Sequence, residues 1–240
     1  MKDFIRKFFF ECNIPVTTNL KNDILLKKII KQTIKEDDIC IDIGCHKGEI
    51  LELFIRYAPK GKHFAFEPIP YYYEKLKTKF PSVNVLNCAL SDESGKQKFF
   101  WIKDKPAYSG LSKRKFTNAD DQILEINVET KKLDEIIPEN IKIKFIKIDV
   151  EGAELKVLQG AEKIIKKDKP VIAFEFGIGG SEFYNTSAQD MFKFFTERNY
   201  SLFDYQSFLN KALPNNEKSF IQTYQENIIY NFVAVSNSTN

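Results

Sequence analysis

From residue 38 onward, the hydrophobic pattern alternates between short apolar runs and longer stretches with helical spacing. The apolar runs predict strands at 39–43, 63–66, 83–88, 145–148, 170–176 and 201–205. The helical stretches lie at 49–57, 71–80, 153–165 and 187–199. A seventh strand is predicted at 227–235, with no good helix between it and the strand before. Short strands separated by helices indicate parallel βαβ units, so we expect an α/β, doubly wound sheet of seven strands, mostly parallel, with an antiparallel hairpin at one edge.

Two segments depart from this alternation. Residues 1–36 have helical periodicity interrupted at Pro15, and they could form either a lid over the main fold or a pad packed on the sheet edge. Residues 95–130 predict two extra strands, at 96–102 and 123–130, around a polar loop at 103–122 that we expect to face the substrate. We therefore divide the chain into an N-terminal helical extension over 1–36 and one α/β domain over 37–236.

The composition agrees with one α/β domain and argues against several classes of protein. The chain has 240 residues, enough for one large domain, and its 36 basic side chains nearly balance 33 acidic ones, so nothing demands nucleic acid as a partner. No apolar stretch reaches the ~20 residues of a transmembrane segment, and the N-terminus lacks a signal-peptide pattern. The four cysteines show no Cys-x-x-Cys spacing. We expect a cytoplasmic enzyme or binding protein.

The segment after the first strand is the first candidate for a ligand site, because open parallel sheets bind ligands at the carboxyl ends of their strands. It reads Asp42-Ile43-Gly44-Cys45-His46-Lys47-Gly48. Gly44 permits a tight turn and close approach of a ligand to the backbone. The next helix offers its free amides to a carboxylate. His46 stands where a dinucleotide site wants a second glycine, which disfavours a pyrophosphate.

The ends of the second and third strands supply the rest of a nucleoside site. Glu67, followed by Pro68, ends the second strand, where a carboxylate can accept hydrogen bonds from both ribose hydroxyls. After the third strand, Ala89 and Leu90 could flank an adenine, although a plain turn explains them nearly as well. Together with the first loop, these residues favour a nucleoside ligand.

Four segments together resemble the FkbM-type methyltransferases. They are Ile41 to Gly48, Ala65-Phe66-Glu67-Pro68, Asn87 to Asp92, and Ile146-Lys147-Ile148-Asp149-Val150-Glu151-Gly152-Ala153-Glu154. The resemblance covers about residues 38–235. It implies a Rossmann-like class I methyltransferase fold, S-adenosylmethionine as the methyl donor, and O-methylation of a sugar, glycan or other small molecule. On that pattern Asp42, Gly44 and Gly48 form the loop at the methionine end and Glu67 is the ribose acid. Cys45-His46 departs from the Ala-Asn more usual in the family, which puts the finer contacts there in doubt.

Three carboxylates are candidates for the chemistry. Asp149 and Glu151 follow the fourth strand and point to the same side if that strand continues, and Glu175 ends the fifth. A sugar hydroxyl is a poor nucleophile, so a general base helps by roughly 10²–10⁴-fold. The same three side chains could instead hold Mg²⁺, although a base is favoured over a metal. Asp149 would also border the cofactor. Tyr108 and Ser109 in the inserted loop, and Tyr184, are candidates to contact the acceptor.

Other readings stay open at this point. A nucleotide-binding oxidoreductase or epimerase, or a non-catalytic nucleotide-binding module, would use the same sheet. A DNA or RNA adenine methyltransferase would want a Pro-Pro-Tyr-type segment where this chain has Asp149-Val150-Glu151-Gly152. Lys113-Arg114-Lys115 is a small basic group that could meet an acidic acceptor. The Phe-rich N-terminus could be the interface of a homo-oligomer or part of the core.

Overall fold

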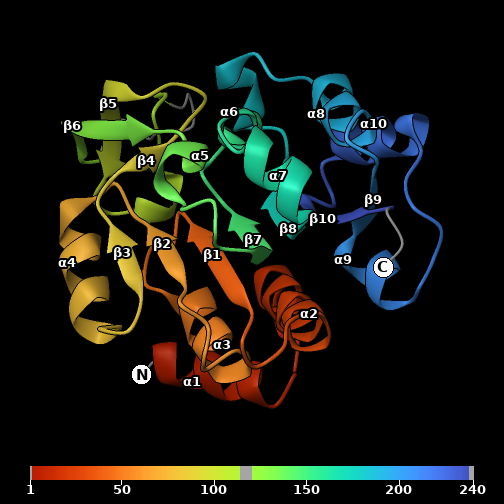
Figure 1. Cartoon of the computed structure of the whole chain (residues 1–240), viewed down its shortest axis with the longest axis horizontal. Coiled ribbons are helices and arrows are strands. Elements are labelled where there is room, and N and C mark those ends of the chain that lie inside the picture. The colour runs from red at the N-terminus through yellow and green to blue at the C-terminus, as the bar shows by residue number, and fades with distance from the viewer. Residues whose placement is uncertain (1, 114–120, 238–240) are drawn as a thin grey trace.

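A seven-stranded sheet forms the centre of the molecule in a computed structural model, which describes residues 2–113 and 121–237. The strand order is β3-β2-β1-β7-β8-β10-β9. Every neighbouring pair is parallel except the two that involve β10 (Figure 1). The bounds are β1 Ile39–Ile43, β2 Phe64–Phe66, β3 Asn84–Leu86, β7 Ile143–Ile148, β8 Val171–Glu175, β9 Tyr200–Asp204 and β10 Asn231–Ser236. The predicted fold class, a Rossmann-like mostly parallel sheet, is confirmed.

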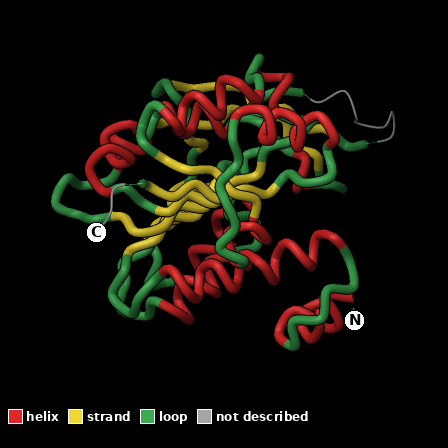
Figure 2. Tube along the Cα trace, turned by 90° about the vertical axis from the view of Figure 1, so that its right-hand side faces the viewer, coloured by secondary structure: helices red, strands yellow, loops and turns green. Residues whose placement is uncertain are grey.

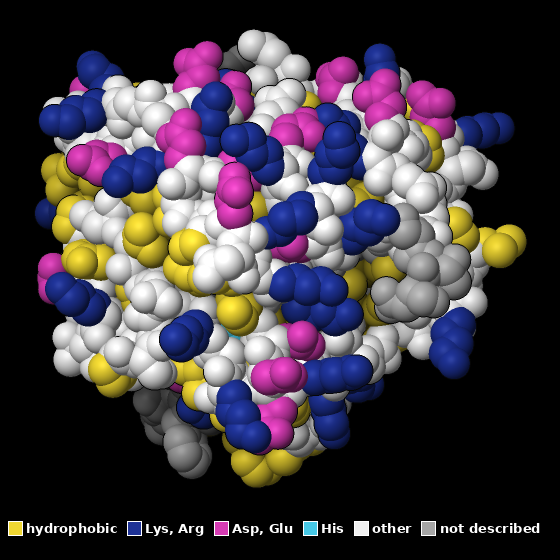
Figure 3. All heavy atoms as spheres, viewed as in Figure 1, with side chains coloured by type: hydrophobic (Ala, Val, Ile, Leu, Met, Phe, Trp, Pro, Cys, Tyr) yellow, Lys and Arg dark blue, Asp and Glu magenta, His cyan; other side chains and the backbone are white. Residues whose placement is uncertain are grey.

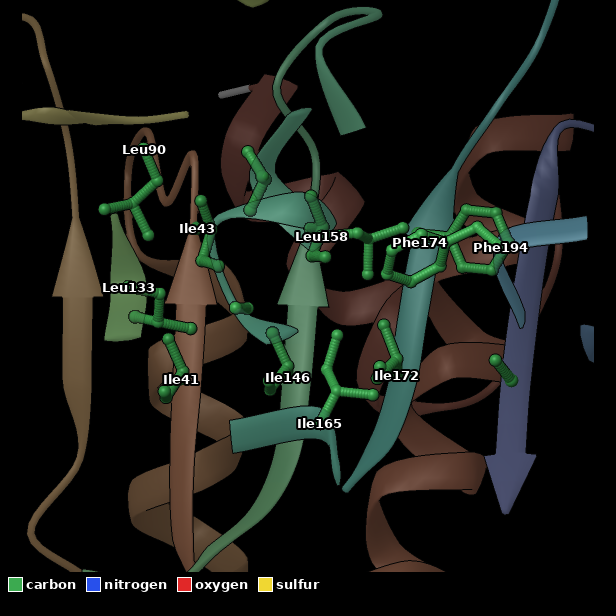
Figure 4. Packing of buried hydrophobic residues seen from close by; sticks show 14 of the residues in the cluster. Ile41, Ile43, Leu90, Leu133, Ile146, Leu158, Ile165, Ile172, Phe174 and Phe194 are labelled. Carbon is green, nitrogen blue, oxygen red and sulfur yellow. The ribbon is translucent and has the colours of Figure 1, made fainter. Parts of the chain in front are cut away.

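Helices cover both faces of this sheet, giving three layers (Figure 2). One face packs on α6 Glu154–Gln159, α7 Glu162–Asp168, α8 Ala188–Thr196 and α10 Glu217–Glu226. Figure 4 shows Ile41, Ile146 and Ile172 side by side on three neighbouring strands of that face. The other face packs on α2 Thr18–Thr33, α3 Glu49–Tyr57, α4 Pro70–Lys79 and α9 Tyr205–Leu209. Burial on both faces explains why the strands read as apolar runs without alternation.

The helix predicted over 153–165 is two helices, α6 and α7. The backbone of Gly160 runs against the Ser91 carbonyl oxygen, which a Cβ on Gly160 would approach to 2.1 Å. Beyond the break, the carboxylate of Asp134 accepts hydrogen bonds from the amides of Lys163 and Ile164 in the first turn of α7. A carboxylate at a helix N-terminus stabilises the helix start. Because Asp134 lies about thirty residues away in sequence, periodicity alone could not show this break.

The prediction that no helix separates the last two strands is wrong. Both α9 and α10 lie between β9 and β10. The antiparallel pairing itself is confirmed, but β10 lies inside the sheet, between β8 and the edge strand β9. In α10, Asn216 caps the first turn by accepting a hydrogen bond from the Ser219 amide, and Phe220 is fully buried. The mixed polar and aromatic sequence of this helix hid its periodicity.

The two extra strands predicted at 96–102 and 123–130 are present as β5 Gly95–Ile102 and β6 Ile123–Lys131. They pair antiparallel, and β6 also pairs with the short β4, Ala89–Leu90, in a separate three-stranded sheet. This small sheet packs through Phe99 and Val128 against Ile69 and Tyr72 at the start of α4. The loop between β5 and β6 contains the turn η1 Pro106–Tyr108. Arg114 and Lys115 of the basic group lie outside the described residues.

The N-terminal segment is two helices, α1 Lys2–Glu11 and α2, separated around Pro15 as predicted. Thr17 caps α2 by accepting a hydrogen bond from the Leu20 amide. Ile29 and Ile30 of α2 are fully buried against the sheet, whereas α1 is attached mainly by ion pairs from Arg6 and Lys7. Phe8 of α1 is largely exposed. The short helix α5, Leu133–Ile136, completes the elements described.

Among the described residues, no helix has the length and apolar character needed to cross a membrane. On the face seen in Figure 3, the Lys and Arg side chains are interspersed with Asp and Glu, so charge of one sign does not gather there.

Candidate functional site

The loop after β1 brings the backbone of two neighbouring strands into contact. Gly44 has φ +78°, and a Cβ there would lie 1.9 Å from the Asp149 carbonyl oxygen, which follows β7. Only glycine fits this position without strain. Gly48, with φ +75°, is the residue directly before α3, and the side chains of Phe80 and Leu76 leave no room there for a Cβ atom. The side chain of Cys45 points into the core, so only its backbone is available to a ligand.

Glu67 holds the turn after β2 together. Its Oε2 accepts a hydrogen bond from the His46 amide at 2.8 Å, and its Oε1 accepts one from the Ile69 amide at 2.9 Å. The side chain is only 4% exposed, and this burial raises the pKa of Glu67 to about 7 despite the two amide donors. Each carboxylate oxygen has a second lone pair, so Glu67 can still accept two further hydrogen bonds from a ligand.

Glu67 opens onto an apolar slot of about 150 Å³ at the carboxyl ends of β1 and β2. Pro68, Ala89 and Leu90, the residues predicted to bind the nucleoside, line this slot. Phe99 and Leu111 of the inserted segment close it from the side of the small sheet. The ring of His46 also borders it and packs on Tyr72 at 4.5 Å between centroids. Burial lowers the pKa of His46, and its Nε2 has no partner among the described residues.

The segment after β7 forms a tight turn rather than continuing the strand. Strand β7 ends at Ile148, and Glu151 has φ +62° and Gly152 φ +110°, so the condition under which Asp149 and Glu151 would point to the same side is not met. Glu154 organises this turn, because its Oε1 accepts hydrogen bonds from the amides of Val150 and Gly152. A non-glycine residue with positive φ costs of the order of 1–3 kcal/mol and is concentrated at functional sites.

A buried lysine lies beneath this turn. Lys147 of β7 is 5% exposed, and its ammonium pairs with Asp149 Oδ2 at 3.2 Å. On the neighbouring strand, Asp42 is its register partner and is equally buried. Asp42 Oδ2 has no hydrogen-bond partner among the described residues. Burial raises the pKa of Asp42 to about 7, although Lys147 opposes this shift. The negative charge of Asp149 raises the pKa of Lys147, against the effect of burial.

A second, larger cavity of about 810 Å³ opens over these charged groups. Asp42, Lys147, Asp149 and Glu175 line its floor on the α2 side of the sheet. Its far wall comes from the N-terminal helices and the C-terminal loop, including Arg6, Asn19, Asn22, Asp23, Asn227 and Tyr230. The Tyr230 hydroxyl donates a hydrogen bond to Asn19 Oδ1 at 2.9 Å and so links the C-terminal loop to α2. Acidic side chains outnumber basic ones among the residues that line this cavity.

The two cavities meet at a shared boundary. Gly44, His46, Asp149 and Glu151 line both, together with Ala107 of η1. The three predicted carboxylates all line the larger cavity, but only Asp149 and Glu151 also line the slot, so Glu175 lies away from the shared boundary. Cys45 also lines the larger cavity, whereas Gly48 lines neither. Any group passed between ligands in the two cavities would cross this boundary, beside Asp149 and Glu151.

The residues predicted to contact the methyl acceptor also differ in which cavity they line. Tyr108 is half exposed on the wall of the larger cavity. Ser109 lines the slot, but its hydroxyl accepts a hydrogen bond from the Ile102 amide. Tyr184 lines neither cavity; its hydroxyl accepts a hydrogen bond from the Ser112 amide and braces the inserted segment.

Asp149, Glu151 and Glu175 do not have the arrangement of the Mg²⁺ site considered as an alternative for them. Within residues 2–113 and 121–237, no group of three or more His, Cys, Asp or Glu side chains is arranged to hold a metal ion. The Lys147 ammonium already occupies the position beside Asp149 that a cation would take.

Sequence reasoning missed Lys147, Glu154 and the contribution of α2. A lysine inside an apolar strand, two residues from Phe145 and therefore on the same face, is a signal for a buried charge. Nothing in the sequence of α2 indicates that Asn19, Asn22 and Asp23 reach the cavity, because that depends on how the helix docks.

Comparison with known proteins agrees with this geometry. The sequence matches the family model described as the methyltransferase FkbM domain over residues 42–202. The methyltransferase sdnD of Sordaria araneosa is 28% identical over 155 residues, covering 51% of this chain and 60% of sdnD. Among solved structures, methyltransferase FkbM from Methylobacillus flagellatus KT superposes with a TM-score of 0.52 at 14% identity, over 90% of this chain and 52% of that one. The chain thus spans about half to three fifths of the length of these relatives.

The fold is that of the Rossmann-like methyltransferases. More narrowly, the chain belongs to the FkbM methyltransferase-domain family. The family resemblance read from the sequence is confirmed.

Proposed function

We propose that this protein transfers a methyl group from S-adenosylmethionine to a hydroxyl group of a sugar, glycan or other small molecule. The observation that carries the proposal is the pair of cavities that meet at Asp149 and Glu151. The smaller has the acid and apolar walls that suit an adenosine, and the larger has carboxylate, carboxamide and phenol side chains that can hydrogen-bond a hydroxylated acceptor.

The residues around the slot fit the cofactor. Glu67 can accept hydrogen bonds from the ribose hydroxyls with the lone pairs that its two amide donors leave. Ala89 and Leu90 offer flat apolar walls to the adenine. Asp42 has an orphaned, buried oxygen that suits the amino group of the methionine portion. When bound, the cofactor supplies an electrophilic methyl group on a sulfonium.

The acceptor would lie in the larger cavity. Carboxamides from Asn19, Asn22 and Asn227 and the ring of Tyr230 are side chains that hydrogen-bond and stack on polyhydroxylated molecules. Asp149 and Glu151 lie where this cavity meets the slot, so one of them would take the hydroxyl proton. Glu175 lines the larger cavity but not the slot and would contact the acceptor instead. Positioning the two reactants side by side supplies much of the acceleration of such a displacement.

Isothermal titration calorimetry tests the cofactor assignment. We expect S-adenosylmethionine and S-adenosylhomocysteine to bind and NAD not to bind. Glu67→Ala should weaken binding roughly 10- to 100-fold, the size of a charge-assisted hydrogen bond. The control is Glu74→Ala, an exposed carboxylate on α4 outside both cavities, which should bind as the wild type does. Tight NAD binding, or full affinity in Glu67→Ala, would refute the assignment.

Incubating cell extracts with methyl-labelled cofactor and the protein should identify a labelled hydroxylated product. With that acceptor, Asp149→Asn or Glu151→Gln should lower turnover by roughly 10²–10⁴-fold if the residue is the base. Full turnover in both variants would show that the general base is not at this boundary. A product methylated on nitrogen or carbon would refute the proposed class of acceptor.

A further inference from the structure

Among the lysines of the described core strands, Lys147 is the one that lines the larger cavity. It stands on β7, directly beside Asp42 of β1 in register, close to the boundary with the nucleoside slot. An ammonium carries three N–H donors. Two contacts at 3.2 Å, to the Ile148 carbonyl oxygen and to Asp149 Oδ2, account for two of these donors.

Acidic groups and one phenol surround this ammonium. Asp42 comes from β1, Asp149 from the end of β7, Glu175 from the end of β8, and the phenol of Tyr205 from α9. Asp23 of α2 lies further out and is paired with Arg6. Within this group, Asp42 Oδ2 and the Tyr205 hydroxyl are buried without a hydrogen-bond partner among the described residues. Buried polar atoms are rarely left without partners, so this cluster is incomplete without a ligand.

The missing partner must offer both an anionic and a cationic group. The Lys147 ammonium suits an anionic acceptor, and the carboxylates of Asp42 and Asp149 suit a cationic donor. Asp149 also lines the slot that suits a nucleoside. The amino-acid end of the proposed cofactor has this chemistry, since it carries one α-carboxylate and one α-ammonium on the same carbon.

We propose that Lys147 binds the α-carboxylate of the cofactor, while Asp42 and Asp149 receive its α-ammonium. This inference rests on the proposed function and adds to it a cofactor-binding residue inside a core strand. A sheet residue holds its position more firmly than a loop residue, so Lys147 would fix the amino-acid end against the floor of the cavity. The reacting methyl group would then be placed at the boundary beside Asp149 and Glu151.

Three ligands separate this role from a structural one. S-adenosylhomocysteine has the whole amino-acid end, its decarboxylated analogue lacks only the carboxylate, and 5′-methylthioadenosine lacks the entire end. By calorimetry on the wild-type protein, decarboxylation should weaken binding roughly 10- to 100-fold, as expected for loss of a charge-assisted hydrogen bond. Equal affinity for the first two ligands would overturn the proposal without any variant.

The variant Lys147→Met is tested with the same three ligands. It should bind S-adenosylhomocysteine and the decarboxylated analogue with the same affinity, while 5′-methylthioadenosine binds as to the wild type. Lys147→Gln serves in the same way if the methionine variant does not fold. The control is Lys144→Met, a half-buried lysine on the same strand and outside both cavities, which should keep the full decarboxylation penalty.

A decarboxylation penalty that persists in the Lys147 variants would show that another group binds the carboxylate. An equal loss of affinity for all three ligands would show that Lys147 only supports the fold. If the wild-type protein binds neither S-adenosylhomocysteine nor 5′-methylthioadenosine, the proposed function itself fails, which is a different result from failure of the Lys147 assignment.

Discussion

At the scale of single residues, the site depends on backbone positions that most side chains cannot occupy. Gly44 and Gly152 have positive φ and touch the backbone of other segments, at Asp149 and Gly180 respectively. Glu151 has positive φ without being glycine. These contacts bring the loops after β1, β7 and β8 together where the two cavities meet.

Gly44→Ala should therefore be strongly destabilising. The positive φ alone costs about 1–2 kcal/mol in the free energy of unfolding, and the contact with the Asp149 oxygen adds to it. Urea unfolding measures the change. The matched control is Gly95→Ala in β5, where a Cβ would meet only Thr130 Oγ1 at 3.9 Å, so little change is expected. Similar stability of both variants would contradict the close approach at Gly44.

At the scale of elements, α2 is part of the core rather than an appendage. Its buried side chains cover one face of the sheet, and its polar side chains line the larger cavity. A boundary at residue 36 would therefore cut through the packed interior, although α1 could be removed with less damage because it is attached largely by exposed ion pairs.

Ile29→Ala tests this role of α2. Ile29 is fully buried, so truncation should lower the free energy of unfolding by about 2–5 kcal/mol through lost burial and the cavity left behind. Ile5→Ala on α1 is the control, because Ile5 is 46% exposed and should cost far less. Chemical denaturation compares the two. If Ile29→Ala behaves like Ile5→Ala, α2 does not belong to the cooperative core.

At the scale of the whole molecule, the site places several carboxylates in the interior. Burial raises the pKa of Asp42, Glu67 and Glu154 to about 7 each. Between their ordinary values near ~4 and 7, the folded protein holds more protons than the unfolded chain. The free energy of unfolding of the ligand-free protein therefore falls as pH rises through this window. Residues that suit the ligand thus reduce stability at neutral pH.

Glu154→Gln should remove part of this pH dependence. The amide keeps an oxygen to accept from Val150 and Gly152 but cannot ionise. Relative to wild type, the variant should gain stability between pH 4.5 and pH 8, on the order of 3 kcal/mol if the whole pKa shift is expressed. Urea unfolding across this range measures it, with the exposed Glu93→Gln as control. If the free energy of unfolding of Glu154→Gln changes with pH as steeply as that of the wild type, Glu154 is already ionised in the folded protein.

The sequence by itself determined the features that are local. The apolar runs predicted the strands, because a strand buried on both faces needs continuous apolar residues. The glycine loop, Glu67 and the Asp149-Val150-Glu151-Gly152 segment marked the site, because parallel strands end at one edge of the sheet. The break between α6 and α7 could not be predicted from local pattern, because its capping partner Asp134 is distant in sequence. Helix α10 was missed for a different reason, since its mixed polar and aromatic sequence shows little apolar periodicity.

Only the tertiary structure decided which of these residues act together. It separated Glu175 from the boundary where Asp149 and Glu151 lie, and it closed Glu67 onto the His46 amide. It also brought Lys147 beside Asp42 and placed α2 over the cavity. These are contacts between segments far apart in the chain, and they are set by how the layers pack, which no local pattern of residues records.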